Sequence, residues 1–509
     1  MQAWADKALW FGFYDLERIA FRIALGWGAE PWGFWRVEGF VMMIEGLLPY
    51  GEYKDSGLRS IGSVPRHWNI HRAKTLFREI DSRSSTGKEE LLSVSHISGV
   101  RKRSELNATM FLAKSNQGHK LCQANDLIIN TMWAWMGALG VSSCSGLVSP
   151  AYGVYRLHST ERLLPMYMHH ILRTPAYVAE YTSRSSGIHS SRLRLYPEQF
   201  LRIPLIIPPP SEQAAIVRFL DHANRRIDRY IRAKRKLIAL LNEQKQAIIH
   251  RAVTRGLDPN VPMKDSGVAW LGEIPAHWEV LRIKNVLREV DHRSTTGKEA
   301  LLSMRMHHGI VPFAEHFTRA PQAATLVGFK VVKPGQFVIN RMQAGNGVIF
   351  PSKLHGLVSP DYAVFDPICD VNVDLLGELF RSPKVRIKFR AESKGLGTGS
   401  SGFLRLYNDR LGAIHIALPS RAEQDSILQG LAEQLKELIA SISRAERQIA
   451  LMREYRTRLT ADIVTGQLDV RNAVQNLPPD AQDSTPVPDD AQDELHEDEG
   501  EIDEGEMAE

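Results

Sequence analysis

The stretch KDSGLRSIGSVPRHW at residues 54–68 decides the fold, because it is written a second time as KDSGVAWLGEIPAHW at residues 264–278. In the longer windows 54–93 and 264–303, 22 of 40 positions are identical. Self-similarity at a constant offset of 210 residues indicates a duplicated structural unit. We therefore expect two domains with one architecture.

The duplication continues beyond these windows at nearly the same offset. Further matches are Gly146-Leu-Val-Ser-Pro150 with Gly356-Leu-Val-Ser-Pro360, Arg194-Leu-Tyr196 with Arg405-Leu-Tyr407, and Leu257-Asp258 with Leu468-Asp469. Between them the copies diverge, since residues 94–118 and 304–328 agree at only 4 of 25 positions. A constant frame with a variable surface suits two modules that bind different ligands. A duplication kept for bulk or for oligomer contacts has no reason to concentrate its differences in this way.

Each repeat ends in a predicted long helix, the first over residues 211–256 and the second over 419–471. Ser420 and Glu423 have the spacing of a capping box. The apolar stripes are Leu220, Ile227, Ile231, Ile238, Leu241 and Ile248 in the first helix, and Leu431, Leu435, Leu438, Ile442, Ala445, Ile449, Met452 and Leu459 in the second. Steps of three and four residues are typical of a coiled-coil seam. We expect the two helices to pair as an antiparallel rod, about 50 Å long for about 35 residues; the alternative is that each packs on its own domain.

The sequence before each long helix is typical of an α+β domain. Short β-rich runs at Asp126–Asn130, Gly153–Arg156, Gln336–Asn340 and Tyr362–Phe365 are separated by Gly, Pro and Ser. The predicted fold is two α/β domains, each followed by a long helix, with pseudo-twofold symmetry. The predicted plan is an N-terminal extension (1–49), a first domain (50–210), a central helix (211–256), a second domain (257–418), a C-terminal helix (419–471) and an acidic tail (472–509).

The body of the protein is basic, whereas its C-terminal end is acidic. Residues 472–509 hold 14 acidic residues and no Lys or Arg, so residues 1–471 hold 63 basic and 44 acidic residues (58 less 14), a net charge of +19. This charge suits a polyanionic partner, although a basic surface kept for solubility has the same composition. The three cysteines form no paired motif, so we expect a reducing, cytoplasmic setting without a disulfide framework. No run reaches the roughly 18 uncharged apolar residues that a membrane span needs.

Motifs for catalysis are missing from the sequence. Gly87-Lys88 and Gly297-Lys298 resemble the end of a P-loop, but Ser82 and His292 replace its leading glycine and Glu follows each Lys, so we reject nucleotide binding. No metalloprotease, hydrolase or kinase motif occurs, and no Asn-Pro-Pro-aromatic tetrapeptide. We predict no catalytic residue and no metal ligand.

Residues suited to DNA contacts concentrate in the diverged segments and in the loops beside them. Arg and Lys can bond guanine, and Asn and Gln suit adenine, while Gly, Ser and basic residues in the loops 184–192 and 394–401 suit phosphates. The candidates are Arg83, Lys88, Arg101, Lys102, Arg103, Asn130, Trp133, Arg184 and Arg192 in the first repeat, and Arg293, Lys298, Arg305, His307, Arg319, Asn340, Arg341 and Lys394 in the second. Basic residues of the first long helix between 225 and 236 would follow phosphates without reading sequence. For any one residue the alternative is a solvated surface charge.

Together these motifs resemble the specificity subunits of type I restriction-modification systems. The resemblance covers about residues 50–471 and rests on the following segments and their second copies: Tyr53-Lys-Asp-Ser-Gly57, Gly62, Pro65-x-His-Trp68, Pro208-Pro-Pro-Ser-Glu-Gln213 and Val464-Thr-Gly-Gln-Leu-Asp469. It implies that two target-recognition domains each read one half of a bipartite site in double-stranded DNA. It also implies that the paired helices set the nonspecific spacer between the halves.

The resemblance further implies partners. The frame would dock two methyltransferase subunits, and restriction subunits with a DNA motor would join them. S-adenosylmethionine, ATP and Mg are then expected on those partners, with no cofactor in this noncatalytic chain. Because the variable segments differ between the copies, we expect an asymmetric target in place of a palindrome. Two alternatives stay open, a self-contained methyltransferase or nuclease with an unrecognised site, and a noncatalytic coiled-coil adaptor.

Two segments depart from the plan of that family. Residues 1–49 have no counterpart before the second copy, and we expect a misassigned start with Met42 or Met43 as the initiator; the alternative is a partner-binding arm. The acidic, Pro-containing sequence from about Pro478 is typical of a disordered tail. We expect this tail to screen the basic body from nonspecific DNA.

Overall fold

The computed structural model describes residues 36–37, 40–41, 47–106, 115–159, 162–187, 193–306, 308–317, 321, 323–395 and 404–478. The predicted initiators Met42 and Met43, and the predicted tail beyond residue 478, lie outside the described residues; before residue 47 these include only the paired strands β1 (Arg36–Val37) and β2 (Phe40–Val41). The chain divides into two compact units, Met1–Ile227 with Leu451–Gly500 and Asp228–Ala450 with Glu501–Glu509. No described helix combines the length and the apolarity needed to cross a membrane.

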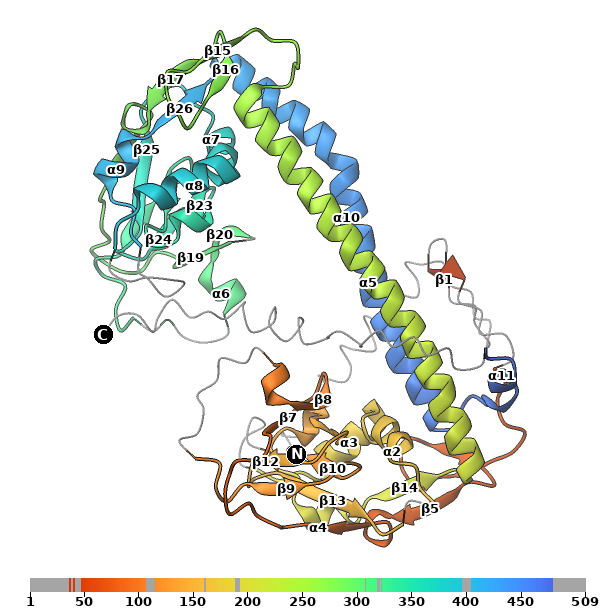
Figure 1. Cartoon of the computed structure of the whole chain (residues 1–509). Coiled ribbons are helices and arrows are strands. Elements are labelled where there is room, and N and C mark those ends of the chain that lie inside the picture. Colours follow the sequence, from red (N-terminus) through yellow and green to blue (C-terminus); the bar gives the residue numbers. More distant parts are fainter. Residues whose placement is uncertain are drawn as a thin grey trace. The chain divides into compact units, whose positions relative to one another are not determined.

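The first unit contains a four-stranded antiparallel sheet and several two-stranded ladders (Figure 1). The sheet has the order β11 (Leu139–Val141), β10 (Leu127–Ile129), β13 (Gly153–Leu157) and β6 (Phe77–Glu79). The ladders pair β3 (Tyr53–Asp55) with β4 (Ser63–Pro65), β5 (Asn69–Arg72) with β14 (Pro204–Ile207), β7 (Leu92–Ser95) with β8 (Gly99–Lys102), and β9 (Lys120–Cys122) with β12 (Gly146–Val148). Three short helices follow: α2 (Pro165–Leu172), α3 (Pro175–Arg184) and α4 (Pro197–Phe200).

The second unit repeats this plan strand for strand. Its sheet has the order β18 (Leu287–Val290), β25 (Ala363–Pro367), β22 (Phe337–Ile339) and β23 (Ile349–Pro351). The ladders pair β15 (Met263–Asp265) with β16 (Glu273–Pro275), β17 (Glu279–Arg282) with β26 (His415–Leu418), β19 (Leu302–Arg305) with β20 (Gly309–Pro312), and β21 (Lys330–Val332) with β24 (Gly356–Val358). The helices are α6 (Phe313–His316), α7 (Val373–Arg381), α8 (Pro383–Glu392) and α9 (Asn408–Ala413). The predicted duplication of an α+β domain is confirmed, and all four β-rich runs lie in strands.

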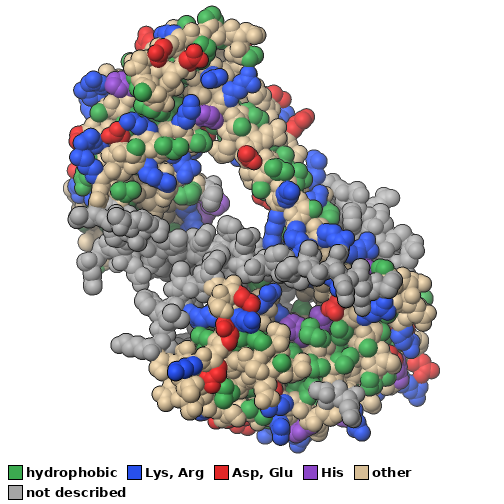
Figure 2. All heavy atoms as spheres, in the orientation of Figure 1, with side chains coloured by type: hydrophobic (Ala, Val, Ile, Leu, Met, Phe, Trp, Pro, Cys, Tyr) green, Lys and Arg blue, Asp and Glu red, His purple; other side chains and the backbone are tan. Residues whose placement is uncertain are grey.

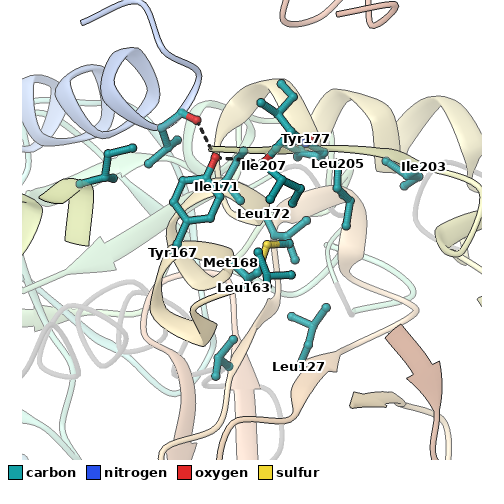
Figure 3. Close-up of a cluster of buried hydrophobic side chains, with 14 of the residues drawn as sticks. Leu127, Leu163, Tyr167, Met168, Ile171, Leu172, Tyr177, Ile203, Leu205 and Ile207 are labelled. Atoms are coloured by element: carbon teal, nitrogen blue, oxygen red, sulfur yellow. Dashed lines mark hydrogen bonds between the residues drawn. The ribbon is translucent and has the colours of Figure 1, made fainter. Parts of the chain in front are cut away.

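The core of the first unit packs α2 and α3 against β10 and β14 (Figure 3). The buried Tyr167 hydroxyl lies 3.1 Å from the carbonyl oxygen of Ile206 and 3.2 Å from that of Val464. Tyr177, also buried, accepts a hydrogen bond from the backbone N–H of Ile206 (3.2 Å). In the second unit Leu375 and Val385 occupy the corresponding helix positions. The same frame is therefore filled with hydrogen-bonded tyrosines in one copy and with aliphatic side chains in the other.

The two long helices are α5 (Pro210–Arg255) and α10 (Arg421–Val464), and both units contain a part of each. In the first unit, the start of α5 shares a core with the end of α10, through Leu220 and Ile463. In the second unit, the end of α5 shares a core with the start of α10, through Val253 and Ile427. The predicted antiparallel pairing is thus confirmed. All eight residues of the predicted α10 stripe are buried, whereas the α5 residues Ile238, Leu241 and Ile248 are only partly buried.

Each long helix begins at a carboxylate that holds the His-Trp motif of its own repeat; this carboxylate is buried at Glu212 and partly exposed at Glu423. Glu212 accepts hydrogen bonds from the Trp68 indole (2.9 Å) and the Tyr50 hydroxyl (3.1 Å), and lies 2.6 Å from His67 Nε2. In the second unit Glu423 accepts a hydrogen bond from the Trp278 indole (3.1 Å) and lies 2.8 Å from His277 Nε2. We call each His-Trp-Glu set the Trp–Glu anchor. Both indole rings are almost fully buried, so the anchor fixes the helix start to the β3–β4 or β15–β16 region.

The predicted capping box at the start of α10 is only half correct. Ser420 Oγ accepts the backbone N–H of Glu423 at 3.4 Å, as expected for a cap. The Glu423 carboxylate, however, is used by the Trp–Glu anchor. A glutamine follows the anchor carboxylate in both repeats and makes the same kind of hydrogen bond. Gln213 accepts the backbone N–H of Leu164 (2.8 Å), and Gln424 accepts that of Asn372 (2.7 Å).

The end of α10 returns to the beginning of the first unit. Asp469 donates its backbone N–H to the carbonyl oxygen of Leu48 (2.7 Å). Gly466 packs so closely on the His-Trp motif that a Cβ atom there would lie 2.3 Å from Pro65 Cδ. Arg471 lies 3.6 Å from Glu212 and over the Tyr50 ring (5.1 Å to its centroid). The first unit is therefore built from both ends of the repeat region.

The boundary predicted for the acidic tail is wrong at its start. Residues 471–475 form helix α11 (Arg471–Gln475), which follows the buried Val470. Ala473 is buried in the core of the first unit, and Val474 and Leu477 pack against it. The acidic run itself begins only at Asp480, after this helix.

We predict that Glu212→Ala destabilises the first unit more than Glu423→Ala destabilises the second. The Glu212 side chain is 8 % exposed and leaves two donors, Trp68 and Tyr50, without a partner, which costs about 3 kcal/mol. The Glu423 side chain is 29 % exposed, so water can replace it and the expected cost is about 1 kcal/mol. Hydrogen exchange of the amides in β14 and β26 would measure the two free energies of opening; equal losses would contradict this ranking.

We also predict that helix α2 of the first unit loses stability on acidification through two histidines that its counterpart α7 lacks. Burial, followed by the nearby Arg173 charge, lowers the pKa of His170 to about 4 and that of His169 well below its usual value. The unfolded chain therefore takes up these protons first, so stability is complete above about pH 6.5 and falls as the pH drops toward 4, by up to about 1.4 kcal/mol per pH unit for one histidine. Gly377 and Glu378 occupy these positions in the second unit.

The measurement for this pH effect is hydrogen exchange of α2 and α7 at pH 7 and pH 5, corrected for intrinsic rates. A selective loss in α2 that His170→Leu reduces is the expected result. Equal responses of α2 and α7 would refute the histidine assignment.

Candidate nucleic-acid interface

A short turn with the sequence Ser-x-Thr-Gly-Lys-Glu occurs in both units. Ser84 Oγ accepts the backbone N–H groups of Thr86 (3.2 Å) and Gly87 (2.8 Å) and donates to Glu89 (2.7 Å). In the second unit the corresponding distances are 3.3, 2.8 and 2.7 Å. These bonds from Ser84 lower the pKa of the Glu89 carboxyl, and the same is true of Glu299. We call the turns at 84–89 and 294–299 the lysine turns, because Lys88 and Lys298 are exposed on them.

The glycine of each lysine turn is required by its surroundings. Gly87 has φ +66°, and a Cβ atom there would lie 2.6 Å from the backbone nitrogen of Gln117. Gly297 has φ +64°, and its Cβ would lie 2.8 Å from the backbone nitrogen of Val327. A side chain would therefore suffer both backbone strain and a collision with backbone.

The predicted contacts Arg83 and Arg293 lie just before these turns and are half exposed. Arg83 lies 3.1 Å from Asp81 and 3.5 Å from the carbonyl oxygen of Gly118. Arg293 makes the same contacts, 3.1 Å to Asp291 and 3.3 Å to the carbonyl oxygen of Gly328. Each guanidinium group therefore binds the chain next to the turn and also exposes its positive charge to solvent.

The variable segments begin in a β-hairpin in each unit. Arg101 and Lys102 lie in β8, and Arg103 follows it; Lys102 lies 3.7 Å from Glu105. Arg305 lies in β19, with its guanidinium 5.2 Å from the centroid of the Phe317 ring. The predicted residues His307 and Arg319 lie outside the described residues.

The predicted contacts Asn130 and Asn340 are both buried (5 % and 2 % exposed), unlike the other described candidates. Asn130 accepts the backbone N–H of Met132 (3.3 Å), and Asn340 accepts that of Met342 (3.1 Å). They shape the loops 130–137 and 340–347 and do not offer free groups to a DNA base. The predicted Trp133 is 49 % exposed at the first of these loops.

The other loop candidates are partly occupied by ion pairs. Arg341 bonds the carboxylate of Glu289, and Arg184 bonds that of Glu180 (3.2 Å). Lys394 is exposed and pairs through its backbone with Arg405. Arg192 and the loop residues 396–401 lie outside the described residues. The structure therefore leaves Lys394 more accessible than Arg341 or Arg184.

The first long helix carries a basic surface as predicted from its sequence. Lys and Arg side chains gather along the paired helices in Figure 2. The basic residues are Arg225, Arg226, Arg229, Arg232, Lys234, Arg235 and Lys236, of which Arg225, Arg226, Arg229 and Lys236 are classed as exposed. Lys234 lies over the Tyr230 ring, 5.3 Å from its centroid.

Sequence reasoning missed the basic helix α8. Lys384, Arg386, Lys388 and Arg390 lie on it, whereas the counterpart α3 has no basic residue before Arg184. Arg390 donates to the side chain of Asn346 (2.8 Å) and so joins α8 to the loop 340–347. The sequence signal that could have revealed this helix is a basic residue at every second position from 384 to 390.

A pocket of about 250 Å³ in the second unit was also not foreseen. It is lined by the end of α5, by Trp270 and by Lys384 and Val385 of α8. Val385 stands where the first unit has Tyr177. Burial, followed by Lys384 and Arg255, lowers the pKa of His250 in its wall. Among the described residues no group of three His, Cys, Asp or Glu side chains is placed to hold a metal ion.

Comparisons with known proteins agree with the motifs. Over 109 residues the chain is 31 % identical to the putative type I restriction enzyme MjaX specificity subunit of Methanocaldococcus jannaschii, an alignment that covers 21 % of this chain and 22 % of that protein. The fold is similar to that of a chain in a structure of the type I restriction-modification system, with TM-score 0.54 and 14 % identity over 79 % of this chain and 98 % of that one. This chain therefore shares the fold of that chain of the type I system.

The HsdS subunit from Thermoanaerobacter tengcongensis aligns over 79 % of this chain and 98 % of its own length, with 15 % identity and TM-score 0.38. No family model matches the chain. The chain matches about a fifth of the length of the Methanocaldococcus specificity subunit. The resemblance to type I specificity subunits inferred from the motifs is confirmed, and the individual DNA-contacting residues stay predictions.

We predict that Gly87→Ala and Gly297→Ala open the lysine turns, at a cost of about 2 kcal/mol or more each, because strain and collision add. Gly62→Ala is the matched control: it has φ +75°, but nothing lies within 4 Å of its Cβ position. The control should cost only about 1 kcal/mol. Hydrogen exchange of the amides in 84–89 and 294–299 would test this; equal effects at Gly87 and Gly62 would contradict the collision.

Proposed function

We propose that this chain is the noncatalytic, DNA-sequence-reading subunit of a type I restriction-modification complex. Each repeat would read one half of a bipartite, asymmetric target in double-stranded DNA. The observation that carries the proposal is the contrast within each unit: the frame is the same strand for strand, whereas the exposed segments attached to it differ. A shared fold with different exposed chemistry is what two readers of different sequences need.

The variable parts support this proposal by their side chains. Trp133 is exposed in the loop 130–137, and Gln343 takes its place in the second unit. The hairpin β7–β8 continues into a short turn of 3-10 helix at 103–105, whereas β19–β20 continues into α6. Such differences would give the two halves different hydrogen-bonding and apolar contacts with base edges.

The long helices would hold the two readers at a defined separation and set the nonspecific spacer. The buried seam of α10 supports a stiff pairing with α5. The basic residues between 225 and 236 would contact phosphates over that spacer. The pseudo-twofold relation between the repeats belongs to this proposal.

Two methyltransferase subunits and restriction subunits with a DNA motor are the proposed partners. Leu237 and Leu240 on α5 and Ile439 on α10 are exposed apolar side chains on the paired helices, which suits docking of another protein. S-adenosylmethionine, ATP and Mg would bind to those partners, and the complex would work in the cytoplasm. A self-contained methyltransferase or nuclease and a plain coiled-coil adaptor are the competing functions.

The experiment is methylation of DNA by the purified chain, with and without the methyltransferase subunit, in the presence of S-adenosylmethionine. Sequence-specific methylation only when both proteins are present is expected. Methylation by the chain alone would favour the self-contained enzyme. Absence of specific DNA binding in the assembled complex would favour the adaptor.

We further predict that replacing residues 92–145 with residues 302–355 changes an asymmetric target into an inverted repeat. Both segments contain the same number of residues at the constant offset of 210, so the frame of the first unit is kept. Methylome sequencing of cells that express the exchanged chain and its methyltransferase would reveal the target. Methylation at the unchanged asymmetric site would refute the placement of the readers.

A further inference from the structure

The lysine turns present the same exposed charge on a hydrogen-bonded support in both units. Ser84, Thr86, Gly87 and Glu89 are all engaged in hydrogen bonds within the turn, and the same residue types repeat them in the second unit. Within the described part of the chain, neither an ion pair nor a hydrogen bond holds the ammonium group of Lys88 or Lys298. Hydrogen bonds therefore hold each turn in place, while the ammonium group of its lysine stays free of partners among the described residues.

Each lysine turn lies at the root of the variable segment. Gly87 packs on the backbone of residues 116–117, where that segment ends. On the other side, Arg103 donates its backbone N–H to the carbonyl oxygen of Leu91 (2.8 Å), and Ser104 bonds Glu90 (2.6 Å). Both ends of the segment are thus tied to the residues around Lys88.

The second unit has the same arrangement around Lys298. Gly297 packs on the backbone of residues 326–327, and Phe313 donates its backbone N–H to the carbonyl oxygen of Leu301 (2.9 Å). The sequences tied there differ from those of the first unit, but the turn does not. The lysine therefore has the same position relative to the variable segment in both units.

A group that is identical in two readers of different sequences cannot distinguish those sequences. The DNA backbone, in contrast, offers the same phosphate at every site. A lysine ammonium is a point charge that suits a phosphate and needs no particular base. A positioning role also explains why the support is rigid, since a phosphate contact sets the register in which neighbouring side chains meet the base edges.

We propose that Lys88 and Lys298 each bind one DNA backbone phosphate, without regard to sequence, and so set the register of the variable segment beside it. This inference rests on the proposed function, and it divides the candidate residues by role. The lysine turns position the duplex, and the exposed residues of the variable segments read it.

The test uses the full chain in its complex with methyltransferase subunits and the double variant Lys88→Gln, Lys298→Gln. The probes are the duplex methylated in the host, as found by methylome sequencing, and a scrambled duplex of equal length, each titrated between 50 and 200 mM salt. Loss of two phosphate contacts should reduce the slope of log affinity against log salt by about 1.8. Between these two salt concentrations the variant should therefore lose about 12-fold less affinity than the native complex. The ratio of target to scrambled affinity should stay within about twofold.

The matched control is Lys74→Gln, Lys284→Gln. These lysines are also exposed and identical in both repeats, so this variant removes the same charge. They lie elsewhere in the frame: the backbone N–H of Lys74 bonds the carbonyl oxygen of Leu201 (2.9 Å), and Lys284 packs beside Gly412. The control should keep the native slope.

The outcomes separate the inference from the proposed function. The inference would be overturned if the salt slope of the Lys88 and Lys298 variant were unchanged, or if both variants changed it equally. Specific binding by the native complex would in that case still support the proposed function. A collapse of target preference together with the slope would also overturn it, because the lysines would then read sequence. Equal binding of both duplexes by the native complex would refute the proposed function itself.

Discussion

The structure depends on a carboxylate that accepts a hydrogen bond from a buried indole at the start of each long helix. Glu212 and Glu423 are separated from Trp68 and Trp278 by about 145 residues, yet each pair is joined by a direct hydrogen bond. A buried carboxylate that lost these donors would be costly, so the helix can begin in only one position on its domain. Because α5 and α10 then run to the opposite unit's core, the two anchors determine the direction of both helices.

The duplication shows which features of a frame must stay constant and which can vary. The anchors, the glutamines that follow them and the lysine turns keep both residue type and geometry. The core behind them is more tolerant, since Tyr167 and Tyr177 correspond to Leu375 and Val385 without a change of topology. Directional polar contacts thus specify the frame, while apolar volume can be supplied in several ways.

Local periodicity predicted the elements well, because it needs only neighbouring residues. The heptad stripe of α10 and the four β-rich runs required no knowledge of distant contacts. The contacts of polar side chains were harder to predict. The Glu423 carboxylate binds an indole, where a capping box was expected. Asn130 and Asn340, predicted to contact DNA, are buried side chains that shape loops. A sequence does not state which polar residue meets a partner 145 positions away or which loop turns inward. The predicted start of the acidic tail is too early for another reason. The residues just before the acidic run form the helix Arg471–Gln475, so the net charge of the segment does not mark where the tail begins.

The return of residues 464–477 to the first unit affects the order of synthesis and folding. A ribosome completes Leu48 and Trp68 long before Gly466 and Val470, which cover the same core. The described core of the first unit is consequently completed only after residues 228–450 of the second unit have been made. A chain that stops short of α11 would keep an open apolar surface in its first unit, which chaperones and proteases recognise. Closure of that core therefore requires residues that are synthesised after the second repeat.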